Sequence, residues 1–455
     1  MQLKKYLTSA AIIAGFTGVA HADDQSLTMY GVTLYGTIDG GIAYQTHGVP
    51  INNSAPVGLE YLTQPSDNKS QVSFAPNGLS QSKIGLKGVE DVGDGFAVLF
   101  KVESGFEPQS GQLADGVKSV IDQNGRAITA QTTQADSSHA GQLFNRAAYV
   151  GINNSTYGVF TFGRQNALQG DAIAIYDPMG GSYAFSPIGY SGAAGGAGQT
   201  QDFRLDNLMK YFNAIGPVRL GAMYQFAGTV GRHDNGYGFD AGADYQGLTV
   251  DAIYTKKKDE VKAGILSLAQ EESVTGLNAT EQAANPITNG YAATVSDNTA
   301  YSFQAKYNLQ DKAKFYGGYE YIRFANPSSP LAVGTVGIGN YIMDVVNNTA
   351  YTHNKILQIS WVGATYTVIP KLDVTVGYYH YDQNAFKTGT AQCSNTSAST
   401  CSGQLNAGSL LIDYHFSKRF DTYIGAMYSQ VVDGLANGFL HNNNIDPTVG
   451  LRFTF

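Results

Sequence analysis

Apolar and polar side chains alternate with a period of two residues through most strand-like segments of this chain. In the segment SKIGLKG, Ile84 and Leu86 lie on one side of an extended backbone, while Lys83 and Lys87 lie on the other. The terminal residues TVGLRFTF repeat the pattern. Such a strand suits a soluble sandwich, whose apolar faces meet inside, or a membrane barrel, whose apolar face meets lipid and whose polar face surrounds water.

Composition and the placement of aromatic residues favour the membrane barrel. Charged residues make up 14% of the chain, against about 25% in ordinary soluble proteins. Tyrosine and phenylalanine lie near the ends of the segments, as they do in the interfacial girdles of membrane barrels. The mean hydropathy of −0.17 indicates that apolar residues are dispersed among polar ones along the chain. A helical membrane protein would instead need runs of about 20 apolar residues.

The spacing of the segments predicts a closed sheet. We expect about sixteen strands, at residues 30–44, 72–89, 95–105, 143–152, 157–165, 204–215, 217–228, 236–246, 247–255, 300–310, 313–324, 354–368, 371–382, 408–416, 420–432 and 446–455. Short turns alternate with long polar stretches, among them 166–203 and 256–299. Because backbone groups within lipid must all be paired, the sheet must close on itself. We therefore predict an all-β fold: a closed antiparallel transmembrane β-barrel with short periplasmic turns and long outer loops.

The first 22 residues have the features of a secretory signal peptide. Lys4 and Lys5 precede the apolar stretch 7–19, and Ala20-His21-Ala22 supplies the small residues of a cleavage site. We therefore expect residues 1–22 to be a signal peptide and residues 23–455 to form a single barrel domain. Secretion leads to an oxidising compartment, where Cys393 and Cys401, the only cysteines, are expected to form a disulfide.

Several classes of function have little support in the sequence. A formal net charge of −8 disfavours nucleic acid as a partner. None of the common nucleophile, P-loop or zinc-hydrolase motifs is present, and the eight histidines are scattered, so we expect no enzyme, cofactor or metal site. A hydrolase whose catalytic residues lie on the barrel wall is the remaining enzymatic alternative, and no sequence motif supports it.

Seven motifs, in order along the chain, resemble the trimeric general porins of the Gram-negative outer membrane, betaproteobacterial branch. They are VTLYGTIDGG, GLKGVEDVGDG, NRAAYVGI, YGVFTFGRQ, RLDNLMKY, YHFSKRFDTYIGAMY and VGLRFTF. The resemblance implies a water-filled outer-membrane channel for passive diffusion of small hydrophilic solutes and ions. It also implies a homotrimer among lipid and lipopolysaccharide, and a third outer loop folded into the pore. Phe455 matches the terminal position that the outer-membrane assembly machinery reads.

Lys83, Arg146 and Arg204 match the basic wall of the pore constriction in these porins. Alternation supports a lumen-facing Lys83, opposite Ile84 and Leu86, and it also supports Arg146, opposite Ala147 and Tyr149. A cationic side chain facing mid-depth lipid would cost several kcal/mol. For Arg204, an exposed strand end is an equally good interpretation.

Four further residues are candidates for the lumen wall. Asp39, Lys87 and Glu320 have inward parity, although each could be an ordinary polar wall residue. Arg164 shares its face with Phe160, so simple alternation places it outward unless it lies at the girdle or past a bulge.

The stretch 166–203 has no Lys, Arg or His and is the segment expected to fold inward. Asp171 and Asp177 are then the predicted acidic side of the constriction, facing the basic wall across a strong transverse field. The alternative is an ordinary outer loop with solvated acids. The cluster Lys256–Glu260, at the start of the predicted loop 256–299, could bind lipopolysaccharide or simply be a solvated loop end.

Three other functions remain open from the sequence. The barrel could be a channel specific for a sugar or a carboxylate. It could serve as a surface adhesin or receptor that displays its loops. The chain could also be a secreted soluble β-sandwich without a role in the membrane.

Overall fold

The computed structural model describes residues 27–47, 70–111, 113, 143–190, 203–228, 233–265, 291–310, 312–333, 344–387, 393–398, 400–436 and 441–455, with a few short pieces between 272 and 342. The predicted signal peptide, residues 1–22, lies outside the described residues. In the part of the chain described here, no helix is long and apolar enough to cross a membrane.

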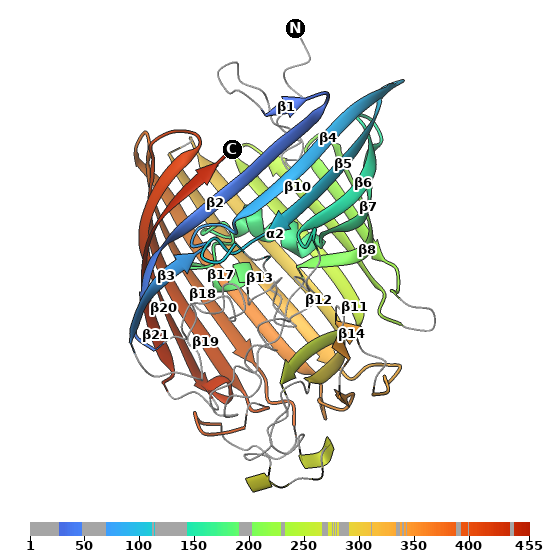
Figure 1. Cartoon of the computed structure of the whole chain (residues 1–455), viewed down its shortest axis with the longest axis vertical. Coiled ribbons are helices and arrows are strands. Elements are labelled where there is room, and N and C mark those ends of the chain that lie inside the picture. The colour runs from blue at the N-terminus through green and yellow to red at the C-terminus, as the bar shows by residue number, and fades with distance from the viewer. Residues whose placement is uncertain are drawn as a thin grey trace.

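The strands close into an antiparallel barrel of sixteen strands, as predicted (Figure 1). In chain order they are β2 (Val32–Gln45), β3 (Gln71–Pro76) with β4 (Lys83–Gly93), β5 (Phe96–Gly105), β6 (Ala147–Asn154), β7 (Gly158–Asn166), β8 (Arg204–Ile215), β9 (Val218–Gln225), β10 (Gly236–Tyr245), β11 (Leu248–Ile265), β12 (Tyr291–Leu309), β13 (Ala313–Ala325), β17 (Lys355–Ile369), β18 (Leu372–Gln383), β19 (Gly403–His415), β20 (Phe420–Asp433) and β21 (Asn443–Thr454). β3 and β4 together occupy one position beside β2. The ring closes where β2 pairs with β21, from Thr37 opposite Thr454 to Ala43 opposite Thr448.

Several short elements lie outside the sixteen strands of the ring. β1 (Thr28–Met29) pairs with the start of β2, and β16 (Val345–Asn347) runs parallel to part of β12. β14 (Gly337–Ile338) and β15 (Tyr341–Ile342) form a separate hairpin, and η4 (Gly434–Ala436) follows β20.

Short turns gather at one end of the barrel, which we call the short-turn end. They include Asp94-Gly95 and Gln246-Gly247, both of which have positive φ at two successive residues. This conformation is the tight hairpin turn whose twist matches that of the flanking strands. β1 and the C-terminus lie at the same end, at the top of Figure 1. The alternation of short turns and long connections is therefore as predicted.

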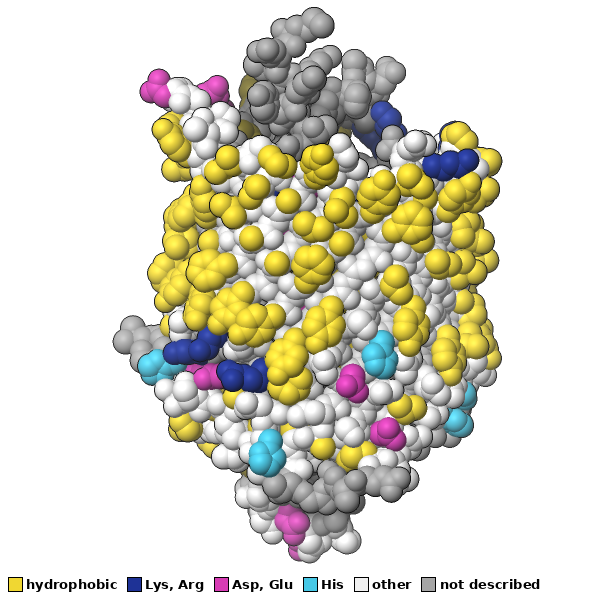
Figure 2. All heavy atoms as spheres, turned by 180° about the vertical axis from the view of Figure 1, so that it is seen from behind, with side chains coloured by type: hydrophobic (Ala, Val, Ile, Leu, Met, Phe, Trp, Pro, Cys, Tyr) yellow, Lys and Arg dark blue, Asp and Glu magenta, His cyan; other side chains and the backbone are white. Residues whose placement is uncertain are grey.

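The outer wall of the barrel is apolar. Phe303, Val376 and Leu451 are 56%, 48% and 54% exposed on this side. In Figure 2, hydrophobic side chains spread over the wall, and the charged side chains lie toward its ends. Ile84 and Leu86 are 47% and 40% exposed on the same side, so the prediction that they lie opposite Lys83 and Lys87 is confirmed.

The predicted strand 72–89 is interrupted at residues 77–82, which corrects its predicted continuity. Asn77 has a positive φ of 62° and cannot continue a strand. Asp39, on the inner face of β2, holds the interruption: its carboxylate accepts hydrogen bonds from the backbone N–H of Leu79 (2.9 Å) and Ser80 (2.8 Å) and from the Tyr423 hydroxyl (2.6 Å). Asp39 thus faces inward as predicted, but it is fully buried, and its hydrogen bonds hold residues 77–82 in place.

The charged cluster Lys256–Glu260 lies within β11, so its assignment to a loop was wrong. β11 and β12 extend together past the predicted limits, with a register shift between Lys257 and Glu260. Lys257 is buried, and its ammonium donates to the Asp234 carbonyl at 2.6 Å. Cross-strand pairing of β11 with β12 resumes at Glu260, which lies opposite Ser296, and continues to Ile265.

Cys393 and Cys401 are joined in a disulfide in the connection between β18 and β19, with their Cα atoms 5.9 Å apart. Cys401 is buried, and its carbonyl accepts a hydrogen bond of 2.9 Å from the Gln383 side chain. The hydrogen bond from Gln383 therefore ties the disulfide-closed connection to the end of β18.

The closure of the barrel depends on glycine at position 41. Gly41 lies opposite Gly450, and a β-carbon there would overlap the carbonyl oxygen of Val449. We call the pairing of β2 with β21 the seam. We expect Gly41→Ala to lower the free energy of unfolding by about 1–3 kcal/mol, because the backbone at the seam must shift. The measurement is the urea midpoint of unfolding in detergent micelles.

Gly408→Ala on β19 is the matched control, since a β-carbon there would meet nothing within 4 Å. Equal midpoints for the two variants would contradict a tightly packed seam.

Candidate functional site

The connection after β7 turns into the barrel, as predicted for the third long loop. We call residues 167–190 the inner segment; it contains α2 (Leu168–Tyr176) and α3 (Pro187–Tyr190). Figure 1 shows α2 inside the ring of strands. Tyr176, the last residue of α2, donates its hydroxyl to Asp251 on β11 at 2.5 Å, and its carbonyl accepts from the Trp361 indole on β17 at 3.0 Å. The helix therefore ends against the wall opposite β7.

A tight bend follows α2 and is organised by Asp177. Gly180 and Gly181 have φ of 63° and 74°, values that glycine adopts without strain. The Asp177 carboxylate accepts from the Gly181 N–H at 2.6 Å and from the Tyr379 hydroxyl on β18 at 2.6 Å. Burial raises the pKa of Asp177, although the hydrogen bond from Tyr379 opposes this shift. Asp177 thus connects the bend to the wall.

Two apolar clusters fill the space between the inner segment and the wall. The larger one contains Met179, Tyr183, Phe185 and Ile188 of the segment, with Trp361, Tyr379, Leu411, Tyr423 and Met427 of β17–β20. The other contains Leu168, Ala172 and Tyr176, with Leu205, Leu208, Met223 and Ile253 of β8–β11. Burying each large apolar side chain contributes about 1.5–3 kcal/mol. Neither cluster includes a described residue of β4, β5 or β6.

The residues of the basic wall, Lys83, Arg146 and Arg204, come from the start of β4, the position just before β6 and the start of β8. They are close enough to interact electrostatically with one another. Arg146 forms an ion pair with Glu103 on β5, with Nε 2.6 Å from Oε1. Within the described residues neither Lys83 nor Arg204 forms an ion pair, and the Arg204 guanidinium lies 4.7 Å from the Phe203 ring.

Glu103 is the residue of this region that sequence reasoning missed. Its Oε2 also lies 3.3 Å from Lys101 Nζ and accepts from the Tyr35 hydroxyl at 2.9 Å. Alternation could have found it, because Lys101 and Glu103 share a face opposite Val98 and Val102. The carboxylate beside the basic wall therefore comes from the wall itself.

The alternation argument for Arg146 was wrong. Ala147 is buried on the inner face of β6, and Val150 and Ile152 are exposed on the outer face. Continued alternation would turn Arg146 outward. It reaches Glu103 because it precedes β6, where regular pairing has not yet begun.

Arg164 is buried beside a bulge, one of the two exceptions considered for it. The register of β7 against β8 shifts between Gly163 and Gln165, and Gly163 has a φ of 124°. Arg164 is 8% exposed and forms an ion pair with Asp206 at 2.8 Å. The extra residue lies in β8, where Asp206 and Asn207 are both opposite Arg164, whereas Arg164 keeps its regular place opposite Ala148 on β6.

The two loop carboxylates do not lie where the sequence placed them. Asp171 forms an ion pair with Lys210 on β8 at 2.6 Å. Asp177 is 2% exposed and bonded to Tyr379 on β18. Their assignment as the acidic side facing the basic wall is therefore corrected: both bond to wall residues other than the basic wall, which fix the inner segment.

The remaining candidates lie on the inner face. Lys87 and Lys101 each have Nζ 5.5 Å from the Tyr35 ring centroid, a favourable cation–π distance. Glu320 is buried on β13. Just beyond β5, burial raises the pKa of Glu107 to about 7.

The bond between Asp177 and Tyr379 predicts how firmly the inner segment is held. Tyr379→Phe removes one hydrogen bond worth about 0.5–1.5 kcal/mol, so backbone amides of residues 168–190 should exchange with deuterium about two- to tenfold faster. Asp177→Ala removes more partners and should accelerate exchange further. Hydrogen–deuterium exchange followed by mass spectrometry measures both.

Tyr366→Phe serves as the control, because Tyr366 is exposed on β17. If Tyr379→Phe exchanged no faster than Tyr366→Phe, Asp177 would not anchor the segment.

Known proteins share this architecture. The anion-selective porin from Comamonas acidovorans superposes with a TM-score of 0.59 at 17% identity, over 93% of this chain and 99% of that one. The trimer form of OmpT from Vibrio cholerae gives a TM-score of 0.55 at 15% identity, over 93% of this chain and 99% of that one.

Sequence comparison agrees with the fold. An outer membrane porin protein of Bordetella pertussis is 28% identical over 255 residues, 55% of this chain; the chain spans 56% of the length of this curated relative. The model of the Gram-negative porin family matches residues 8–434. The chain therefore belongs to the Gram-negative porins, and its place is the bacterial outer membrane.

Proposed function

We propose that the chain is a channel rather than an enzyme, and that small hydrophilic solutes and ions diffuse through it passively. The observation that carries this proposal is the division of the lumen by the inner segment. Apolar clusters fill the sides next to β8–β11 and β17–β20, whereas β4, β5 and Arg146, just before β6, present charged side chains. Water and solutes would pass along this charged side, with the short-turn end facing the periplasm.

The charges on that side favour anions. Lys83 and Arg204 have no ion pair among the described residues, and the ion pairs of Arg146 and Lys101 share the single carboxylate of Glu103. In a narrow channel the effective dielectric is below that of bulk water, so an uncompensated charge acts strongly on passing ions. The basic wall would therefore set a preference for small anions.

The same residues favour one narrower function. Two uncompensated cations beside the Tyr35 hydroxyl and Arg146 could hold a carboxylate, whereas they offer little to a neutral sugar. A carboxylate-specific channel would show saturable block of its ion current by that carboxylate.

We also propose that the protein is exported by its signal peptide and assembles as a homotrimer among lipid and lipopolysaccharide. The exposed apolar wall supplies surface for both lipid and neighbouring copies. Phe455 exchanges backbone hydrogen bonds of 3.0 Å with Gly36 in the finished barrel. The assembly machinery would thus recognise Phe455 before β2 pairs with β21.

Replacing the uncompensated cations tests the proposal. Lys83→Gln combined with Arg204→Gln should lower the permeability ratio of chloride to potassium at least about fivefold, since each charge near the ion path contributes on the order of 1 kcal/mol. The ratio is obtained from the reversal potential across a planar bilayer under a salt gradient.

Lys418→Gln combined with Arg419→Gln removes the same net charge from a short turn and is the matched control. An unchanged ratio in the lumen variant, or an equal change in the control, would refute the basic wall as the selectivity element. Absence of any conductance step in the wild type would refute the channel itself.

A further inference from the structure

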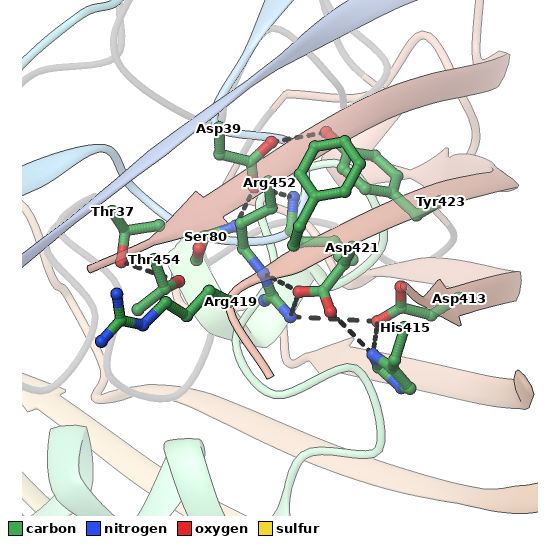
Figure 3. A network of polar contacts seen from close by, with 12 residues as sticks. Thr37, Asp39, Ser80, Asp413, His415, Arg419, Asp421, Tyr423, Arg452 and Thr454 are labelled. Atoms are coloured by element: carbon green, nitrogen blue, oxygen red, sulfur yellow. Dashed lines mark hydrogen bonds and ion pairs between the residues drawn. The ribbon is translucent and has the colours of Figure 1, made fainter. Parts of the chain in front are cut away.

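A second group of polar side chains lies inside the barrel at the short-turn end, away from the basic wall. Asp413 and His415 come from the last turn-proximal residues of β19, and Asp421 comes from the first residues of β20 (Figure 3). His415 and Asp421 are directly opposite each other in the register of the two strands. Leu410 and Ile412 of β19 are exposed on the lipid side, so Asp413 and His415 face the lumen.

The ligand atoms of these three side chains converge. Their candidate donor atoms all lie within 4.8 Å of one another. His415 Nδ1 lies 2.7 Å from Asp421 Oδ1 and 3.9 Å from Asp413 Oδ2. One ring nitrogen therefore faces two carboxylate oxygens from different strands.

The neighbouring residues leave these donor atoms available. His415 Nε2, the other ring nitrogen, faces Asp373 Oδ2 on β18 at 3.4 Å. Arg452 on β21 donates to Oδ2 of Asp421, through Nε at 2.8 Å and Nη2 at 2.6 Å, and its Nη2 lies 3.9 Å from Asp413 Oδ2. Oδ1 of Asp421 remains directed at the histidine. A carboxylate that accepts a hydrogen bond from the second ring nitrogen is a usual partner of a metal-binding histidine.

Charge and burial point the same way. Three carboxylates, those of Asp373, Asp413 and Asp421, lie beside His415, and the Arg452 guanidinium pairs with two of them, so negative charge is in excess when His415 is neutral. Asp413 is only 9% exposed, and its Oδ1 has no hydrogen-bond partner among the described residues. A buried carboxylate oxygen without a partner is costly, and a cation would satisfy it.

We propose that Asp413, His415 and Asp421 form a binding site for a divalent transition-metal ion of the zinc class. An imidazole nitrogen with two carboxylate oxygens is a ligand set that suits Zn²⁺, whereas Mg²⁺ and Ca²⁺ prefer oxygen alone. His415 Nδ1 would bind the ion while Nε2–H donates to Asp373, which fixes the tautomer. The sequence carried one signal for this site: Asp413 and His415 are two residues apart, which places both on one face of a strand.

A proton on Nδ1 would make a similar contact with Asp421, so the experiment must detect the ion itself. The mature protein, without an affinity tag, is stripped with a chelator and titrated with Zn²⁺ in detergent by calorimetry. We expect one saturable site whose affinity falls at least about tenfold in Asp413→Asn and in His415→Asn.

Two substitutions elsewhere in the wall are matched controls. His380→Asn removes a half-buried histidine that bonds to Asn406, and Asp240→Asn removes a buried carboxylate that also has an oxygen without a partner. Both controls should bind Zn²⁺ as the wild type does. Equal affinity in all five proteins, or no saturable binding by the wild type, would overturn the proposal.

X-ray absorption at the zinc edge decides the matter if a variant fails to fold. Scattering from one imidazole in the Zn²⁺-loaded wild type supports the site, and an all-oxygen shell overturns it. Because neither measurement uses ion conduction, the outcome is independent of the proposed channel function.

Discussion

The pairing of every backbone N–H and C=O group within lipid is the constraint on which this structure depends. It requires β2 to meet β21 and leaves no free edge in the ring. Once the ring is closed, its strands have only two faces. The apolar face must meet lipid, so charged residues such as Lys83 and Asp251 must share the interior. Charge inside the barrel is therefore a consequence of closure, and the arrangement of those charges is what remains to distinguish one such barrel from another.

The inner segment determines that arrangement. Its apolar residues pack on Trp361, Tyr379 and Tyr423, large aromatic side chains that alternation alone would assign to a wet lumen. Its carboxylates, Asp171 and Asp177, bind to the wall and hold the segment in place. The barrel thus separates two tasks: one side of the interior is packed like a protein core, and the other carries the basic wall.

The sequence predicted the ring well because alternation and turn spacing are local properties. It failed where the outcome depends on which residues lie opposite each other. The bulge of β8 opposite Arg164, and the irregular backbone before β6 that lets Arg146 reach Glu103, both depend on a neighbouring strand. The partner of Asp177 comes from β18, distant in sequence, and the partner of His415 is found only from the register of β19 against β20. A carboxylate in a loop can therefore be identified from the sequence, whereas the residue to which it bonds cannot.

In the barrel described above, adjacent residues of one strand face lipid and water in turn. Nitroxide labels at single cysteines replacing Leu86, Lys87, Phe453 or Arg452 test this directly, through their relaxation by oxygen, which dissolves in lipid, and by a water-soluble nickel chelate. Labels at Leu86 and Phe453 should respond mainly to oxygen, and labels at Lys87 and Arg452 mainly to nickel. Equal responses at both members of a pair, or the reverse order, would contradict the barrel's inside-out polarity.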